Sequence, residues 1–444
     1  MRRVPLLHPF SLIRISVLAL ACSGPVQATD LEIHGSNTVG ARLAPMLMTA
    51  YLEQYTGTEV TEQETRHENE KLLIAENQGA TVTVKVAAHG SSTGYKALAS
   101  GQAGIWASSR PVKDSEVEAM KDRADLTSLD NEHVIAIDGL AVLVHPDNPV
   151  SQMSMDTLAR VFSGAITNWS EVGGPDLNIS LYARDERSGT WDTFKTLVLG
   201  KKYPLAGSAR RYESNDQLSD DVSKDPSAIG FAGLASVRNS KLLAISDGDA
   251  PALKPNQLTV ASEDYPLARR LFMYTPGPAT TAMAKDFIEF ALGADGQAIV
   301  SRSGFISQNP MAVWPEFDSS VPESFRRLTG NYLRLTVNFR FAEGRTRLDN
   351  KAKRDVQRIA DYLARENRSA DDLMLIGFAD RQSNELRAQM ISELRALSVR
   401  KALNEQGVMD VAYTGYGQAM QIGSSGGDSG QRRNGRVEVW IKAR

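Results

Sequence analysis

Cysteine is almost absent from this 444-residue sequence, because Cys22 is the only one. It lies among the first 28 residues, which are typical of a secretory signal peptide: Arg2 and Arg3 precede an apolar run, and Val26-Gln27-Ala28 forms a small-residue cleavage site. Cleavage after Ala28 leaves no thiol in the exported chain. That excludes disulfides, thiolate catalysis and cysteine-bound metals.

Long apolar runs are missing as well. The stretch from Ile15 to Ala21 is too short to cross a bilayer, and no later stretch reaches about 18 apolar residues. We therefore predict a soluble periplasmic chain without a transmembrane segment. Ala19-Leu20-Ala21-Cys22 is similar to a lipoprotein processing box, although Ala19 stands where a larger aliphatic residue is usual, so an outer-membrane lipoprotein anchored through Cys22 is an alternative.

Histidine and net positive charge are scarce too. The six histidines have no paired spacing of the kind that metal ligands show, so we expect no metal and no cofactor. The net charge of −3 argues against nucleic acid as a partner. From Ser324 onward, however, 22 Lys/Arg stand against 14 Asp/Glu, which leaves +8 there and −11 in the rest. Such asymmetry indicates two domains with different partners.

The pattern along the chain also divides it in two. Strand-like and helix-like stretches alternate from Leu31 to about Gln308, which predicts an α/β architecture, and a proline-punctuated break follows. A strand from Leu333 to Phe341 then opens a second pattern of strands and helices. The predicted division is a signal peptide (1–28), a two-lobed binding domain (29–310), a linker (311–332) and a small α+β domain (333–444).

Turns rich in glycine and hydroxyl side chains punctuate the first domain, each between a predicted strand and a helix. Free N–H groups at a helix start, close backbone approach at glycine, and hydroxyl donors together favour a bound anion, and a guanidinium adds a fork that matches two of its oxygens. Ser and Thr are also common helix caps, so one such turn alone indicates little. The four turns are Gly35-Ser36-Asn37-Thr38, His89-Gly90-Ser91-Ser92-Thr93-Gly94, Ala107-Ser108-Ser109-Arg110, and Arg184 with Ser188-Gly189-Thr190.

Four segments of this domain resemble the phosphate-binding periplasmic proteins of ABC transporters. They are VFSGAITNW at 161–169 with EVGG at 171–174, Arg184-x-x-x-Ser188-Gly189-Thr190, DPSAIGF at 225–231, and Gly304-Phe305. The resemblance implies a type II binding-protein fold with the anion between two lobes, and an ABC-transporter permease as a further partner.

The resemblance also implies the ligand set. The oxyanion-binding residues it points to are Ser36, Asn37, Thr38, Ser91, Thr93, Ser109, Arg184, Ser188, Gly189 and Thr190. Some phosphate binders have an aspartate where Ser109 stands, and serine carries no charge to repel sulfate. Phosphate is the first choice of ligand, and another tetrahedral oxyanion stays open. Arg110 is left between a ligand role and pairing with nearby acids.

The chain from Leu333 onward resembles an OmpA-like domain of βαβαβ type. The motifs that carry this are Phe339-x-Phe341, Leu348-Asp349, Gly377-Phe378-Ala379-Asp380, Ile391 to Ala396, Gly415-Tyr416-Gly417 and Asn434-Gly435-Arg436. The resemblance implies peptidoglycan binding, with Asp380 on the ammonium and Arg395 on the carboxylate of diaminopimelate in the peptide stem, and with Asn434 and Arg436 beside them. Ser383, Ala388 and Gly435 depart from the family pattern.

The interpretation with the widest support is a non-enzymatic binding protein that captures phosphate or a similar oxyanion and is tethered to peptidoglycan. Two alternatives stay open. Gly90-x-Ser92-x-Gly94 fits the nucleophile elbow of a serine hydrolase, although the only downstream histidines, His133 and His145, lie in or beside apolar runs. A structural or adhesive cell-wall protein with a repurposed binding domain is the second.

Overall fold

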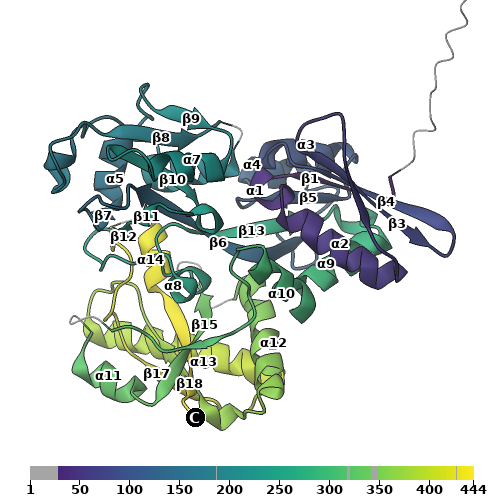
Figure 1. The fold of residues 1–444 in the computed structure, drawn as a ribbon. Coiled ribbons are helices and arrows are strands. Elements are labelled where there is room, and N and C mark those ends of the chain that lie inside the picture. Colours follow the sequence, from purple (N-terminus) through teal and green to yellow (C-terminus); the bar gives the residue numbers. More distant parts are fainter. Residues whose placement is uncertain (1–28, 187, 318–320, 342–347, 427) are drawn as a thin grey trace, which may run out of the picture.

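The computed structural model describes residues 29–186, 188–317, 321–341, 348–426 and 428–444. The predicted signal peptide, with Cys22, lies outside these residues. Two lobes lie side by side above a third body formed by the C-terminal part of the chain (Figure 1). None of the helices in the described ranges is long and apolar enough to span a bilayer.

One lobe, the first lobe, is built around the parallel strand β1, which pairs with β4 and β5. Apolar side chains of β1 and β4 pack against α2 and α9 in one continuous core. The strands of this lobe are β1 (Leu31–Gly35), β2 (Thr61–Glu64), β3 (Glu70–Asn77), β4 (Ala80–Ala87) and β5 (Ile105–Ser108). Its helices are α1 (Asn37–Gly40), α2 (Leu43–Thr56), α3 (Ser91–Ser100), α4 (Asp114–Met120), α9 (Ala282–Leu292) and α10 (Ala294–Arg302).

The second lobe has a smaller sheet in which β10 pairs with β8, and β8 with β9. Phe162, Phe194 and Phe231 pack against one another at its centre, and the rings of Phe194 and Phe231 stack 3.9 Å apart. Its strands are β7 (Gln152–Ser154), β8 (Ser180–Arg184), β9 (Arg210–Tyr212), β10 (Ala228–Gly233), β11 (Lys241–Leu242) and β12 (Ala244–Ser246). Its helices are α5 (Met155–Phe162), α6 (Gly189–Phe194) and α7 (Asn215–Val222), and α8 (Gln257–Ala261) follows at its edge.

Two long strands connect the lobes into one eleven-stranded sheet. The strand β13 (Ala268–Tyr274) pairs with β5 of the first lobe and with the first half of β6 (Glu132–Val144). The second half of β6 pairs with β10 of the second lobe. The passage between lobes falls near Gly139, so β6 and β13 are the hinge strands.

The C-terminal domain has a separate five-stranded sheet, in the order β14-β15-β18-β16-β17. Its two long helices cover this sheet, and α12 contributes Val356, Ile359 and Leu363 to the core at helical spacing. Its strands are β14 (Ala312–Val313), β15 (Tyr332–Arg340), β16 (Leu373–Gly377), β17 (Ala412–Gly415) and β18 (Arg436–Lys442). Its helices are α11 (Glu323–Thr329), α12 (Asn350–Arg365), α13 (Glu385–Glu405) and α14 (Asp428–Asn434).

The predicted fold class is confirmed: a two-lobed α/β binding domain precedes a smaller domain of sheet and helices. Some local features differ from the expectations. Residues 311–332, expected as a linker, contribute β14, which pairs with β15, and helix α11.

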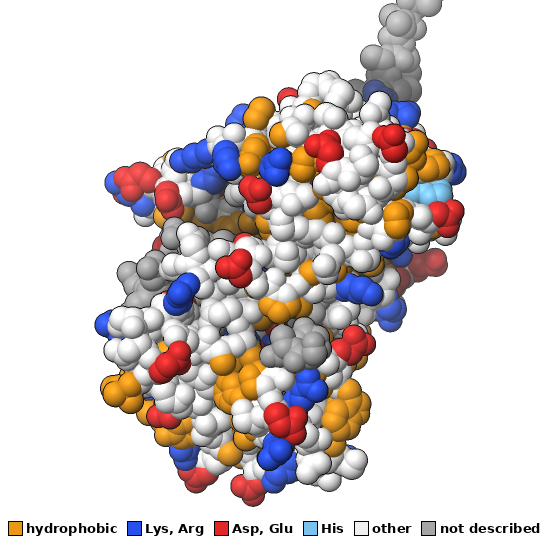
Figure 2. Space-filling view, turned by 90° about the vertical axis from the view of Figure 1, so that its left-hand side faces the viewer, with side chains coloured by type: hydrophobic (Ala, Val, Ile, Leu, Met, Phe, Trp, Pro, Cys, Tyr) orange, Lys and Arg blue, Asp and Glu red, His pale blue; other side chains and the backbone are white. Residues whose placement is uncertain are grey.

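Positive and negative side chains are interspersed over the face drawn in Figure 2. Some arginines of the C-terminal domain form ion pairs with acids of the binding domain, so part of its excess positive charge is neutralised inside the molecule. Arg334 and Arg340 both donate to the carboxylate of Asp264, at 2.7 and 2.6 Å. The positively charged C-terminal domain and the negatively charged binding domain therefore contact each other through ion pairs.

Candidate functional site

Three hydroxyl side chains from separate turns of the first lobe converge at its edge toward the second lobe. Ser91 begins α3, and its Oγ accepts from the backbone N–H of Ser109, at 3.2 Å, and lies 3.4 Å from Ser109 Oγ. Ser36 follows β1, and its backbone N–H donates to the carbonyl of Ala107, at 2.8 Å. The Ser36 hydroxyl is buried and has no hydrogen-bond partner among the described residues. Such an orphaned group calls for a ligand or water.

The turn before α6 brings the second lobe against these hydroxyls. Ser188 caps α6 by accepting from the backbone N–H of Trp191. A Cβ built on Gly189 would lie 1.8 Å from Ser109 Oγ, so only glycine permits this approach. Thr190 Oγ1 lies 3.4 Å from Thr38 Oγ1 of the first lobe. The lobes are therefore closed on one another at the predicted site.

Arg184, at the end of β8 and four residues before Ser188, is almost wholly buried. Its guanidinium donates to the carbonyls of Tyr212 and Glu213, at 3.2 and 2.6 Å, and to the side chain of Asn215. Burial lowers the pKa of Arg184 to about 10; Asp185 opposes this and a second arginine, Arg269, adds to it. Since that pKa remains far above neutrality, Arg184 stays a cation.

Sequence reasoning missed this second arginine. Arg269 on β13 donates to Asp138 on the paired strand β6, at 2.6 and 2.9 Å, and both side chains are buried. It also donates to Thr190 Oγ1, at 3.1 Å, and to Thr193 Oγ1, at 3.3 Å. An arginine occupying a lone pair of Thr190 leaves the hydroxyl proton of that threonine available to the cleft. The sequence signal was present as Asp138 and Arg269, charged residues inside two otherwise largely apolar strands, where a buried charge needs a partner.

Two of the predicted ligand residues lie at the margin. Thr93 is exposed, and its hydroxyl donates to the carbonyl of Gly90 in its own turn, at 2.7 Å. Asn37 is half-buried at the start of α1. Arg110 pairs with both oxygens of Glu116, at 2.8 and 2.7 Å, so of its two roles the structure shows the pairing with an acid.

The geometry around Ser92 does not resemble a hydrolytic triad. Ser92 is exposed, and its Oγ accepts from Arg110, at 3.4 Å. His133 is buried between Thr275 and Arg354, and burial, aided by Arg354, lowers its pKa to about 3. The nearer His89 lies 3.0 Å from Glu70. The described contacts of these histidines therefore lead away from Ser92.

In the C-terminal domain, Asp380 and Arg395 come together as an ion pair. Asp380 follows β16, and its Oδ1 accepts from Arg395 Nη2, at 3.0 Å. Arg395 projects from α13, also donates to the carbonyl of Phe378, at 3.0 Å, and is nearly buried. Asp380 remains partly exposed. A carboxylate and a guanidinium side by side, with one of them open to solvent, can hold the two ends of a zwitterion.

Asn434 and Arg436 lie behind this pair and hold its surroundings. Asn434 accepts from the backbone N–H groups of Ile422 and Gly423, at 2.8 and 2.9 Å, and is wholly buried. Arg436 donates to Glu438, at 2.8 Å, and lies over the ring of Phe378, 3.9 Å from its centre. Both side chains therefore support the loop and the strand end instead of projecting from them.

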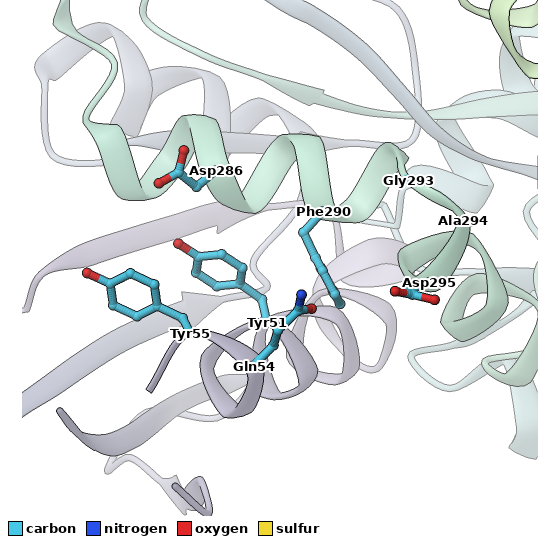
Figure 3. A pocket seen from close by; sticks show the side chains of 8 residues that line it. All are labelled: Tyr51, Gln54, Tyr55, Asp286, Phe290, Gly293, Ala294 and Asp295. Atoms are coloured by element: carbon cyan, nitrogen blue, oxygen red, sulfur yellow. The ribbon is translucent and has the colours of Figure 1, made fainter. Parts of the chain in front are cut away.

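A separate hollow of about 530 Å³ lies on the first lobe, between α2 and the junction of α9 with α10 (Figure 3). Tyr51, Gln54 and Asp286 line it, and burial, with Asp286 nearby, raises the pKa of Tyr51 to about 12. It contains none of the predicted anion ligands. The predicted anion site is closed to solvent. It is therefore recognised by its converging buried polar groups and not by an open volume.

Comparison with known proteins follows the same division of the chain. Residues 27–295 match the model of the PBP superfamily domain, and residues 340–435 match the OmpA family. The phosphate-binding protein PstS of Bacillus subtilis is 32% identical over 243 residues, which are 54% of this chain and 76% of that protein. The PstS protein of Borreliella burgdorferi is 29% identical over 225 residues, 49% of this chain and 77% of that protein.

A solved structure gives the same picture. The ABC-type phosphate transport receptor from Vibrio cholerae superposes with a TM-score of 0.50 at 26% identity, covering 62% of this chain and 99% of that one. The chain therefore belongs to the PBP superfamily, with PstS proteins among its relatives, and carries a C-terminal domain of the OmpA family.

Proposed function

We propose that this chain is a periplasmic binding protein that closes its two lobes on phosphate, or on a related tetrahedral oxyanion, and that its C-terminal domain holds it at peptidoglycan. It is not an enzyme in this proposal. It hands its anion to an ABC-transporter permease, and its similarity to the ABC-type phosphate transport receptor of Vibrio cholerae supports this step.

One observation carries the anion proposal. The hydroxyl of Ser36 is buried without a partner in the described chain, at the point where Ser109, Gly189 and Thr190 meet from opposite lobes. Arg184, four residues before Ser188, supplies a buried cation at the end of β8. Each hydrogen bond to a charged ligand contributes about 1.5–3 kcal/mol, so a few converging donors are enough for a tightly held anion.

Calorimetry of the exported chain with phosphate and with sulfate tests the ligand. We expect phosphate to bind, and Ser91→Ala to weaken binding by about 1.5–3 kcal/mol because one donor to a charged group is lost. The matched control is Ser92→Ala, which removes the next hydroxyl of the same helix, on its exposed side. Equal affinity of the two variants would contradict the proposed site, and binding of a sugar or amino acid instead of either anion would contradict the ligand class.

Sulfate discrimination has its own test at Ser109. An aspartate there accepts the proton of hydrogen phosphate and repels a fully ionised anion. We expect Ser109→Asp to bind sulfate more weakly than the parent chain while it keeps phosphate. Unchanged sulfate binding in this variant would place Ser109 outside the ligand shell.

The Asp380–Arg395 pair supports the peptidoglycan part of the proposal. Sedimentation with purified sacculi is expected to retain the parent chain and to lose Asp380→Asn, because the ammonium of diaminopimelate then has no carboxylate. Asp371→Asn removes an exposed acid of the same domain and serves as the control. Equal retention of both variants would exclude Asp380 from the contact.

A further inference from the structure

The anion site is sealed from solvent in this arrangement of the lobes. Ser36, Ser109 and Thr190 have no exposed surface, and Arg184 is 3% exposed. An anion can therefore enter or leave only when the lobes separate about the hinge strands β6 and β13. Whatever holds the lobes together controls the release of the anion.

The C-terminal domain contacts the first lobe through the start of α12. Asn350 donates to Glu132 and to the carbonyl of Thr127, at 3.2 and 2.9 Å. One turn later, Arg354 donates to the carbonyl of Leu129, at 3.3 Å. These contacts join one end of the C-terminal domain to the loop and strand on the first-lobe side of the hinge.

The same domain contacts the hinge region through β15. Asp264, which follows α8, is almost fully buried and receives Arg334, Arg340 and Asn338 from β15, at 2.6–2.9 Å. Burial raises the pKa of Asp264, but Arg334 and Arg340 outweigh this and hold that pKa well below its usual range. On the hinge strand itself, Arg270 donates to Asp349, the N-cap of α12, at 2.8 Å.

A third contact joins the domain to the second lobe. Asp247, directly after β12, accepts from the backbone N–H of Ser424, at 3.0 Å, and pairs with Arg433 of α14. Gly248 lies so close that a Cβ there would meet Ser424 at 2.9 Å. Figure 1 shows α14 rising from the C-terminal domain to the strands β11 and β12. The domain therefore bridges both lobes and the hinge between them.

The segment that holds the second lobe also backs the candidate peptidoglycan pair. Asn434, next to Arg433, fixes the backbone of Ile422 and Gly423. A Cβ built on the following Gly435 would lie 2.8 Å from the guanidinium of Arg395. A movement of the second lobe thus reaches the surroundings of Arg395 through a continuous run of contacts.

We infer that the chain couples its two ligand sites: the C-terminal domain bridges the closed lobes through Asp247, so anion binding in the cleft and stem-peptide binding at Asp380 and Arg395 strengthen one another. Opening the lobes must break at least one of these three sets of contacts. Among the described residues, the set at Asp247 has the fewest hydrogen bonds. This inference rests on the proposed function and adds regulation to it.

The test removes the contact of the C-terminal domain with the second lobe and measures the affinity and release rate of phosphate. Asp247→Ala is expected to release phosphate about fivefold faster and to bind it correspondingly more weakly, because the closed state loses a contact that holds it together. A fivefold change lies at the lower end of usual couplings between sites. Asp249→Ala, which removes an exposed acid two residues away, is the matched control and should match the parent chain. Thermal unfolding of both variants checks that the fold is retained.

A second arm measures reciprocity with a soluble stem peptide that contains diaminopimelate. In the parent chain, phosphate should raise the affinity for this peptide by the same factor by which the peptide raises the affinity for phosphate. In Asp247→Ala both factors should fall toward one. A parent chain that binds neither ligand would contradict the proposed function. Phosphate affinity and release unchanged in Asp247→Ala, or parent factors already equal to one, would overturn the coupling alone.

Discussion

Among single residues, Arg269 and Asp138 form a buried ion pair in the binding domain. They lie opposite one another on the hinge strands, at a directly paired position of the register. Only one oxygen of Asp138 has a partner in the described chain, since Oδ1 is buried without one. A buried ion pair of this kind adds little net stability, but breaking it is costly because it leaves one charge uncompensated.

Replacing Arg269 with methionine should therefore destabilise the protein by about 3–5 kcal/mol, because Asp138 is left as an isolated buried charge. Urea unfolding measures this. The double variant with Asp138→Leu should recover most of the loss. A double variant no more stable than the single one would show that the cost comes from lost packing and not from the stranded carboxylate.

At this scale the sequence predicts one part of the site and not the other. Ser36, Ser91 and Thr190 lie in short motifs whose chemistry is local, and the structure brings their turns together. The guanidinium of Arg184 instead donates to the segment from Tyr212 to Asn215. The role of Arg269 depends on a strand pairing more than 130 residues away. No local pattern encodes such a pairing, so only the register of β6 and β13 reveals it.

Among the elements, α3 depends on a glycine that faces the sheet. A Cβ on Gly94 would lie 2.5 Å from Gly35, from the carbonyl of His34 and from the ring of Trp106. This glycine lets α3 approach β1 and β5 closely enough to bring Ser91 beside Ser109. Helix propensity alone favours alanine here, so packing overrides it.

Gly94→Ala should destabilise the chain by about 1–3 kcal/mol through overpacking and should also weaken phosphate binding, because α3 must shift. Guanidinium unfolding and calorimetry measure the two effects. Gly207→Ala is the control, since a Cβ there meets nothing within 4 Å. A neutral Gly94→Ala would mean that α3 can move without cost to the site.

Long periodic elements were predicted well, and short ones were not. The strand predicted from Leu333 to Phe341 matches β15 closely because its apolar spacing is regular. The strand β14 has two residues and exists through its partner β15, and α11 is a two-turn helix held by Phe325 in a cluster with Trp440. Such elements depend on tertiary contacts, which short windows of sequence do not contain.

For the whole molecule, the interface between the domains contains a group that titrates below neutrality. His133 lies beside Arg354 of the C-terminal domain, and the hydroxyl of Thr275 and the backbone of Asp130 are further polar neighbours. Burial first, and Arg354 second, lower its pKa from 6.5 to about 3. The folded chain thus keeps His133 neutral where the unfolded chain protonates it.

Stability should therefore be complete above pH 6.5 and decline as the pH falls from 6.5 toward 3, by about 1.4 kcal/mol per pH unit for this one proton. Urea unfolding at pH 7 and pH 5 measures the slope. His133→Gln should flatten it over this range, whereas His67→Gln, on the exposed surface, should not. The same slope in His133→Gln and in the parent chain would assign the acid sensitivity to other groups.

The division into two unlike domains was predictable from the charge asymmetry and the proline-rich break. Their contact was not. The uneven charge was interpreted as a sign of two external partners, and the structure shows that Asp247, Asp264 and Glu132 also meet donors of the C-terminal domain directly. Opposite surpluses on two segments indicate mutual attraction as much as separate ligands, and sequence alone does not distinguish these.

The hinge strand β13 carries neighbouring arginines that serve opposite sides of the sheet. Arg269 reaches the threonines of the cleft, while Arg270 reaches Glu263 and the cap of α12. Adjacent side chains of a strand alternate between its faces, so inserting or deleting a single amino acid just upstream would turn each arginine to the wrong face of the sheet. Removal of the C-terminal domain would take Arg334 and Arg340 away from Asp264 and would leave Arg270 with Glu263.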